Sequence, residues 1–277
     1  ASYLHSKPKT DFYHSLPVKR THLLNANAIA AMIVLLVPYL AIILITMLLQ
    51  FVQVGAYINL FDYFFTTIME VLNHCLLMLV VYLFVTFISV NLGTIFDSAI
   101  ISVSMGFIPL TTVAVLLALW SNYIYGADVS YRFLPYLSPY IYSFNRVGFF
   151  DYYNQTTSYL KPFVVGIIYA VAFYLLGVYS YKVRKSETAE QKDSSSWPQT
   201  ITKCFVSFIS ATGFFFIFEY YGLVIQIIAA IIGGTLIGII AEIILSRGIR
   251  SIVKNLKWLA GAGALFCLII IVLQFDI

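Results

Sequence analysis

Residues 28–49 read AIAAMIVLLVPYLAIILITMLL and contain no charged side chain. A helix of that length is about 33 Å long at about 1.5 Å per residue, enough to cross the hydrocarbon core of a bilayer. Six later stretches carry at most one charge each, and they cover residues 64–90, 98–120, 162–181, 204–218, 220–241 and 258–275. The sequence therefore predicts an all-α polytopic membrane protein with about seven transmembrane helices.

The fifth stretch, residues 204–218, is too short to span a bilayer as it stands. Extended backwards through residues 200–203 it reaches a spanning length. Glu219-Tyr220-Tyr221-Gly222 follows directly and is typical of a tight turn. We expect the fifth and sixth stretches to form a helical hairpin.

The basic residues predict the orientation. Thirteen of the 16 Lys and Arg residues lie before the first stretch, between the fourth and fifth, or between the sixth and seventh. The three others are Arg132, Arg146 and Lys161. Because loops rich in Lys and Arg stay in the cytoplasm, we predict a cytoplasmic N-terminal segment and a C-terminus outside.

The composition argues against several function classes. The formal net charge of +4 is explained by basic helix ends near anionic headgroups, so nucleic acid is not an expected partner. Cys75, Cys204 and Cys267 lie in or beside apolar stretches without paired spacing, which favours packing over a disulfide or metal site. The sequence has no phosphate-binding loop and few ionisable groups at membrane depth. We expect neither a cofactor nor catalysis by this chain.

The N-terminal segment ends in DFYHSLPVKRTHLL, residues 11–24. Ser15 can cap a helix whose first turn accepts Pro17, which places Lys19 and Arg20 just before the membrane. Phe12 and Tyr13 precede this helix with no membrane to enter. The alternative from composition alone is an interfacial helix that lies on the headgroups.

Three segments carry a resemblance to a known family. They are SYLHSKPKTDFYHSLPVKR (residues 2–20), YKVRKSETAEQKDSSS (181–196) and GGTLIGIIAEIILSRGIRSIVK (233–254). The chain resembles the ABC-2 class of ABC-transporter permeases, especially the Ytr-type permeases of Gram-positive bacteria. The resemblance covers essentially the whole chain, and the first segment is its most specific part.

The resemblance implies a permease subunit in the plasma membrane that exports, or confers resistance to, an amphipathic or cell-envelope-active compound. Its implied partners are separate cytoplasmic ATPase subunits and a second permease, identical or related. The N-terminal segment would dock on the ATPase as a coupling helix. Its candidate coupling residues are Phe12, Tyr13, Ser15, Leu16, Pro17, Lys19 and Arg20.

The chain also departs from the family pattern. Family members have two spanning helices before the Ser-Leu-Pro segment, which this sequence lacks, so we expect a trimmed chain. The predicted organisation is a coupling segment (residues 1–27), core helices (28–182), a charged, Ser-rich linker (183–203) and a three-helix module (204–277).

The predicted outer connection, residues 121–161, is unusually aromatic. It contains nine Tyr and four Phe, with Pro135 and Pro139 able to break any continuous helix. Tyr prefers the membrane–water boundary, so one interpretation is a passive aromatic belt. The resemblance implies the other, namely short re-entrant helices that close an outer gate. In both cases we expect the segment to pack on the membrane side.

Two groups within the predicted helices were candidate functional or packing residues. Glu70, Asn73 and His74 share a helix face through their i, i+3 and i+4 spacing. They either pack against neighbouring helices or line a substrate path, and we expect Glu70 and His74 to face away from lipid. Gly234 and Gly238 form a Gly-x-x-x-Gly face for close helix packing, most simply within the chain. Glu242 is expected to reach water or Arg247 near the cytoplasmic end.

Two other functions are compatible with the sequence. A sensor or accessory membrane protein could use the same N-terminal segment to bind an ATPase or kinase. A secondary transporter would be expected to show internal repeats, and none relates the first four stretches to the last three. The substrate is not indicated by any residue pattern.

Overall fold

This computed structural model describes residues 5–54, 60–123, 130–143, 160–184 and 197–246, together with residues 261 and 263. All regular elements in these ranges are helical, which confirms the predicted all-α class. Six described helices are long and apolar enough to span a membrane, over Thr21–Leu49, Thr67–Val90, Ile95–Asn122, Leu160–Val183, Trp197–Ile217 and Leu223–Ser246. The chain is a multi-pass membrane protein, and all of the predicted seventh span except residues 261 and 263 lies outside the described residues.

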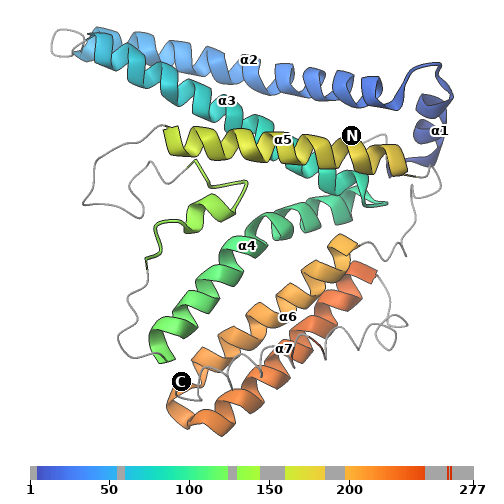
Figure 1. The fold of residues 1–277 in the computed structure, drawn as a ribbon, viewed down its shortest axis with the longest axis vertical. Coiled ribbons are helices and arrows are strands. Elements are labelled where there is room, and N and C mark those ends of the chain that lie inside the picture. The colour runs from blue at the N-terminus through green and yellow to red at the C-terminus, as the bar shows by residue number, and fades with distance from the viewer. Residues whose placement is uncertain are drawn as a thin grey trace. The chain divides into compact units, whose positions relative to one another are not determined.

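One compact unit holds α1, α2, α3 and α5. Their bounds are Lys7–Ser15, Arg20–Val54, Leu60–Val90 and Leu160–Val183. α3 and α5 share its most extensive interface, and α2 contacts both (Figure 1). The most apolar part of α2 has no buried residue, so most of that helix surface remains available to lipid or to another subunit.

The helices of this unit pack at matching heights. Tyr82 donates a hydrogen bond to the backbone oxygen of Asn27 at 3.3 Å. Asn27 lies about 10 Å past the start of α2, and Tyr82 about 12 Å before the end of α3. α2 and α3 are therefore antiparallel, with Arg20 and Val90 at the same membrane side. The charge distribution predicts that this side is cytoplasmic.

A second compact unit holds α4 (Ile95–Tyr123), η2 (Leu134–Leu137), α6 (Trp197–Ile217), η5 (Glu219–Tyr221) and α7 (Leu223–Ser246). α6 and α7 form the predicted hairpin, and α4 packs on α6. The core of this unit consists of Leu119, Phe208, Ala211, Phe215 and Ala230. α4 thus groups with the last helices, whereas the predicted core placed it with α2, α3 and α5.

The α6–α7 hairpin differs from expectation at its start and matches it at its turn. α6 begins at Trp197, so it includes residues 200–203, as the backward extension requires, and also residues 197–199 of the predicted linker. Pro198 fits there because the first helical turn needs no backbone donor at that position. At the turn, Gly222 has a φ of 86°, a left-handed conformation that side chains disfavour. The helix is therefore long enough to span, and the turn needs its glycine.

Candidate functional site

An irregular segment packs against α3 and α5 within the first unit. Residues 139–143 form a non-helical turn, which we call the aromatic turn. Tyr140 contacts Phe84 edge-on at 5.7 Å between ring centroids, and Tyr142 contacts Tyr169 at 5.8 Å. Phe173 joins these two contacts, because its ring lies 4.9 Å from Phe84 and 5.4 Å from Tyr169. The five rings form one continuous aromatic cluster.

The aromatic turn reaches deep into the helix pair. Its partners on α5 are Gly166 and Tyr169, which lie about 9–14 Å past the first residue of that helix. A connection that only crossed the membrane surface would meet the first turn of α5. Residues 139–143 of the predicted aromatic loop therefore pack against α3 and α5 instead of projecting as a soluble loop. The predicted packing of the whole loop against the outer membrane face stays a prediction. Residues 124–129 and 144–159 of that loop lie outside the described residues.

Gly166 makes room for the side chain of Tyr142. A Cβ atom at position 166 would lie 2.6 Å from the Tyr142 hydroxyl and 2.6 Å from Leu76 Cδ2, far inside van der Waals contact. Only glycine allows α3, α5 and the aromatic turn to approach this closely. The packing brings three separate segments together at one backbone position.

The Tyr142 hydroxyl is enclosed without a polar partner. The side chain has no exposed surface, and among the described residues its hydroxyl makes no hydrogen bond. A tyrosine hydroxyl is protonated at neutral pH, so this group can donate a hydrogen bond. Because most buried hydroxyls find a partner, this one calls for an explanation.

Asn73 presents a second such atom on the face of α3 that packs on α5. Its side chain is 4% exposed, its Nδ2 donates to the backbone oxygen of Met69, and its Oδ1 has no partner among the described residues. It lies one helical turn before Leu76, which contacts Gly166. The region around Gly166 thus combines close packing with two unsatisfied polar groups.

Glu70 and His74 point elsewhere. Both are exposed on the surface of the chain, and His74 Nδ1 lies 2.9 Å from the backbone oxygen of Glu70. The His74 ring also lies 6.0 Å from that of Tyr39 on α2. Glu70 is about 30 Å from the Val90 end of α3, close to the outer edge of a bilayer core. Their predicted role at an interface or path stays a prediction.

The N-terminal segment forms a short helix, although not the predicted one. α1 starts with Pro8 in its first turn and ends at Ser15, whose hydroxyl donates to the backbone oxygen of Phe12. The prediction that Ser15 caps a helix with Pro17 in its first turn is wrong. A residue before proline disfavours helical geometry, and Leu16 is accordingly extended, with ψ 142°.

Apolar side chains of this segment remain uncovered. The exposed fractions of Phe12 and Val18 are 62% and 54%, and Tyr13 and Leu16 are also exposed. Phe12 and Tyr13 pack edge to face at 5.6 Å. Lys19 and Arg20 then lead into α2, so this surface is continuous with a spanning helix. An uncovered apolar surface beside basic residues suits a partner protein or the headgroup region.

The predicted cytoplasmic ends of α2, α3 and α5 meet in one junction. Leu24, Val90 and Tyr181 form a buried cluster there. Arg184, just past α5, donates from Nη1 to the backbone oxygens of Ser89 at 3.1 Å and Val90 at 2.5 Å. The guanidinium thereby satisfies carbonyls that the end of α3 leaves open, and its charge complements the helix dipole.

The α6–α7 hairpin uses the predicted glycine face within the chain. A Cβ at Gly234 would lie 2.8 Å from Ala211 Cβ, and the Ser207 hydroxyl donates to the Gly234 oxygen at 2.9 Å. Gly238 is buried on the same helix. At the turn, Gln226 donates to the backbone oxygen of Glu219 at 2.9 Å. Small residues and hydrogen bonds together fix the register of the two helices.

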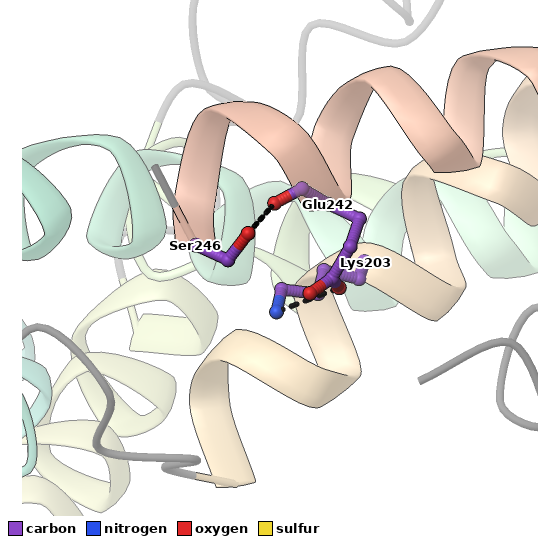
Figure 2. A network of polar contacts seen from close by, with 3 residues as sticks. All are labelled: Lys203, Glu242 and Ser246. Atoms are coloured by element: carbon purple, nitrogen blue, oxygen red, sulfur yellow. Dashed lines mark hydrogen bonds and ion pairs between the residues drawn. The ribbon is translucent and has the colours of Figure 1, made fainter. Parts of the chain in front are cut away.

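Figure 2 shows an ion pair at the other end of this hairpin. Lys203 Nζ on α6 lies 2.8 Å from Glu242 Oε2 on α7, and the Glu242 side chain is fully buried. Ser246 donates to the backbone oxygen of Glu242 at 2.6 Å. The expectation that Glu242 reaches water is wrong, because α6 starts early enough to bring Lys203 alongside it. Arg247 lies outside the described residues.

Sequence reasoning missed three of these features, namely Gly166 with Tyr142, the Arg184 cap, and the Lys203–Glu242 pair. The first two join residues 24 and 94 or 95 positions apart, and no local pattern marks such contacts. The ion pair had a signal, because Lys203 and Glu242 are the charges at the predicted cytoplasmic ends of neighbouring stretches. No family model, curated protein or solved structure matches the chain.

Proposed function

We propose that this chain is the membrane-spanning subunit of an ATP-binding-cassette exporter in the plasma membrane, energised by separate ATPase subunits. The observation that carries the proposal is the uncovered apolar surface formed by Phe12, Tyr13, Leu16 and Val18. It lies on a segment whose charge predicts a cytoplasmic location and whose sequence resembles the coupling segment of ABC-2 permeases. The ATPase would cover this surface.

The connection from this surface into the membrane supports the same proposal. Only residues 16–19 separate α1 from α2, and α2 is tied to α5 through the Tyr174 hydroxyl, which lies 3.3 Å from Asn25 Oδ1. The Leu24, Val90 and Tyr181 cluster joins α2 to α3 and α5 at the same level. A displacement of the docking surface would therefore be passed to three spanning helices. We call the cluster of Leu24, Val90 and Tyr181 the cytoplasmic junction.

The aromatic turn supplies a candidate closure on the predicted outer side. Non-helical backbone at membrane depth is tolerated where protein buries it or where it lines a water-filled path. In one state the aromatic turn would be buried in the α3–α5 interface. In another state it would leave that interface and line a water-filled path, so its non-helical backbone would be tolerated in both. ATP-driven work then requires that the ATPase binds the two states with different affinity, since otherwise it shifts nothing.

The docking surface is tested by replacing Phe12 and Leu16 with Asp in the full chain. We expect both variants to insert into the membrane but to lose co-purification with the ATPase subunit, because charge on the contact surface is unfavourable. Tyr220→Asp is the matched control, since Tyr220 is 97% exposed in the hairpin turn at the predicted outer side. Unchanged ATPase capture by the Asp variants would refute the proposed docking surface.

The interfacial-helix alternative predicts a different result. If α1 only lies on headgroups, Phe12→Asp lowers binding of the N-terminal segment to anionic vesicles and leaves ATPase capture intact. Transport itself is tested by reconstituting the complex in liposomes and measuring ATP hydrolysis with and without candidate amphipathic compounds. Stimulation by a compound that also accumulates inside inverted vesicles would establish export.

A further inference from the structure

The aromatic turn is held by two opposing sets of interactions. Contacts of Tyr140 and Tyr142 with Phe84 and Tyr169 favour its inserted position, because edge-on aromatic pairs are attractive. The buried Tyr142 hydroxyl opposes that position. In leaving water or headgroups it loses hydrogen bonds and gains none from the described residues.

Gly166 sets the limit of insertion. The Tyr142 hydroxyl and Leu76 already occupy the space where a Cβ would lie, 2.6 Å from each. The turn cannot move closer to α5 to find a polar group. Asn73 Oδ1 on α3 is an acceptor that a Tyr hydroxyl can use, one helical turn before Leu76, but the two groups make no hydrogen bond with each other. The inserted position is therefore packed tightly, while two polar atoms have no partner within the described ranges.

We infer that the aromatic turn is a strap poised to release: Tyr142 inserts and withdraws from the α3–α5 interface, and its hydroxyl, which has no hydrogen-bond partner among the described residues, keeps the inserted state only weakly favoured. Withdrawal lets the hydroxyl bond to water or headgroups, which offsets part of the lost aromatic contact. If the Tyr142 hydroxyl had a hydrogen-bond partner in the inserted position, the aromatic turn would stay in the α3–α5 interface. Small free-energy changes in α3 or α5 can then move the strap between its two positions.

The neighbouring glycine of α5 offers a matched contrast. A Cβ at Gly177 would meet only Phe87 Cβ, at an ordinary 4.0 Å. Replacing Gly166 by Ala should therefore push Tyr142 outward, whereas Gly177→Ala should leave the strap in place. Tyr142→Phe acts in the opposite direction from Gly166→Ala, because it keeps the ring and removes the unsatisfied hydroxyl.

Hydrogen exchange of the full chain in lipid nanodiscs, read over the aromatic turn (residues 139–143), tests the inference without any ATPase. We expect Tyr142→Phe to slow exchange about five- to tenfold. Gly166→Ala should accelerate it by at least as much. Tyr131→Phe, which alters an exposed tyrosine outside the aromatic turn, and Gly177→Ala should leave the rates within about twofold.

Exchange that is unchanged or faster in Tyr142→Phe would overturn the inference, because it would mean that the hydroxyl has a partner in the native membrane. If Gly166→Ala fails to fold, the Tyr142→Phe result alone decides. A second measurement uses Ser143→Cys in a chain whose own cysteines are replaced by Ala. Labelling by a membrane-impermeant maleimide should then be slowed by Tyr142→Phe. Because neither measurement involves the ATPase, both are independent of the proposed transport function.

Discussion

The α6–α7 hairpin and the aromatic turn are both packed through glycine, yet their polar groups are treated in opposite ways. In the hairpin, Gly234 brings the helices together, and Ser207 and Lys203 are paired across the interface. In the aromatic turn, Gly166 brings segments together around a hydroxyl that is unpaired among the described residues. Close approach alone does not make an interface rigid.

Polar pairing determines which interface can open. Separating the hairpin would break the Lys203–Glu242 ion pair and would leave the Ser207 hydroxyl and the Gly234 oxygen without each other in the apolar part of the interface. Withdrawing the aromatic turn toward the membrane surface gives the Tyr142 hydroxyl water or headgroups to bond with, whereas the inserted position offers it no partner in the part of the chain that the structure describes. Thr202 is the exception in the hairpin, because its buried hydroxyl has no partner among the described residues. We expect the hairpin to behave as a fixed element and the turn as a movable one.

The largest expected loss of unfolding free energy is in the α6–α7 hairpin, the fixed element. Glu242→Ala leaves Lys203 without its carboxylate in a mostly buried position, and such changes typically cost about 3–5 kcal/mol of unfolding free energy. Lys203→Met combined with Glu242→Leu should recover most of that loss. Denaturant titration of the full chain in micelles measures both, and equal losses in the single and double variants would show that the ion pair is not the cause.

The counterpart on the movable side is Phe173, whose ring contacts Phe84, Phe87 and Tyr169. Phe173→Ala should cost about 2–4 kcal/mol, because it removes the ring that connects the aromatic cluster. In the Phe173→Ala variant, hydrogen exchange should rise in α3, α5 and residues 130–143 while α6 and α7 stay protected. Equal acceleration in the hairpin would mean that the two regions unfold as one.

A smaller difference in stability is expected between alanine substitutions at two glycines of the hairpin. Gly234→Ala places a Cβ 2.8 Å from that of Ala211, and such overpacking typically costs about 1–3 kcal/mol. At Gly213 nothing lies within 4 Å of an added Cβ, so Gly213→Ala should stabilise by about 0.5–1 kcal/mol through helix propensity. Thermal unfolding of the two variants side by side measures the difference. The same sign for both would contradict the packing described for Gly234.

The smallest effect is expected at the hairpin turn. Gln226→Met removes the hydrogen bond to the Glu219 oxygen, worth about 0.5–1.5 kcal/mol, beside a turn that solvent or headgroups can reach. Proteolysis at residues 219–222 in nanodiscs would report local opening before any global loss. If Gln226→Met also changed the stability of the Lys203–Glu242 ion pair, the two ends of the hairpin would be coupled.

The architecture was largely predictable from sequence because each spanning stretch carries its own signal. Residues 28–49 are apolar for longer than a bilayer is thick, and Gly222 marks the hairpin turn without any tertiary information. The first residue of α6 was harder to predict, because Trp197-Pro198 is equally typical of the end of a linker and of a helix start. Only the Lys203 contact with Glu242 favours the second interpretation.

The candidate site was less predictable, since its chemistry depends on contacts between distant residues. The aromatic composition of residues 121–161 predicted packing on the membrane side, but not that Tyr142 would meet Gly166. In the N-terminal segment, the Ser15 and Pro17 pattern fits a helix start and a helix end alike. Pro8 supplies the better start, and the conformation before Pro17 then ends the helix.

The ion pair of the hairpin has a consequence for biosynthesis. Lys203 leaves the ribosome seconds before Glu242 does, at ordinary rates of chain elongation. Until α7 arrives, the ammonium of Lys203 can only extend toward the headgroups of the predicted cytoplasmic side, so α6 alone should sit shallowly in the bilayer. Arrival of Glu242 neutralises that charge and lets the two helices settle together. The order of synthesis thus makes α7 the element that completes the insertion of α6.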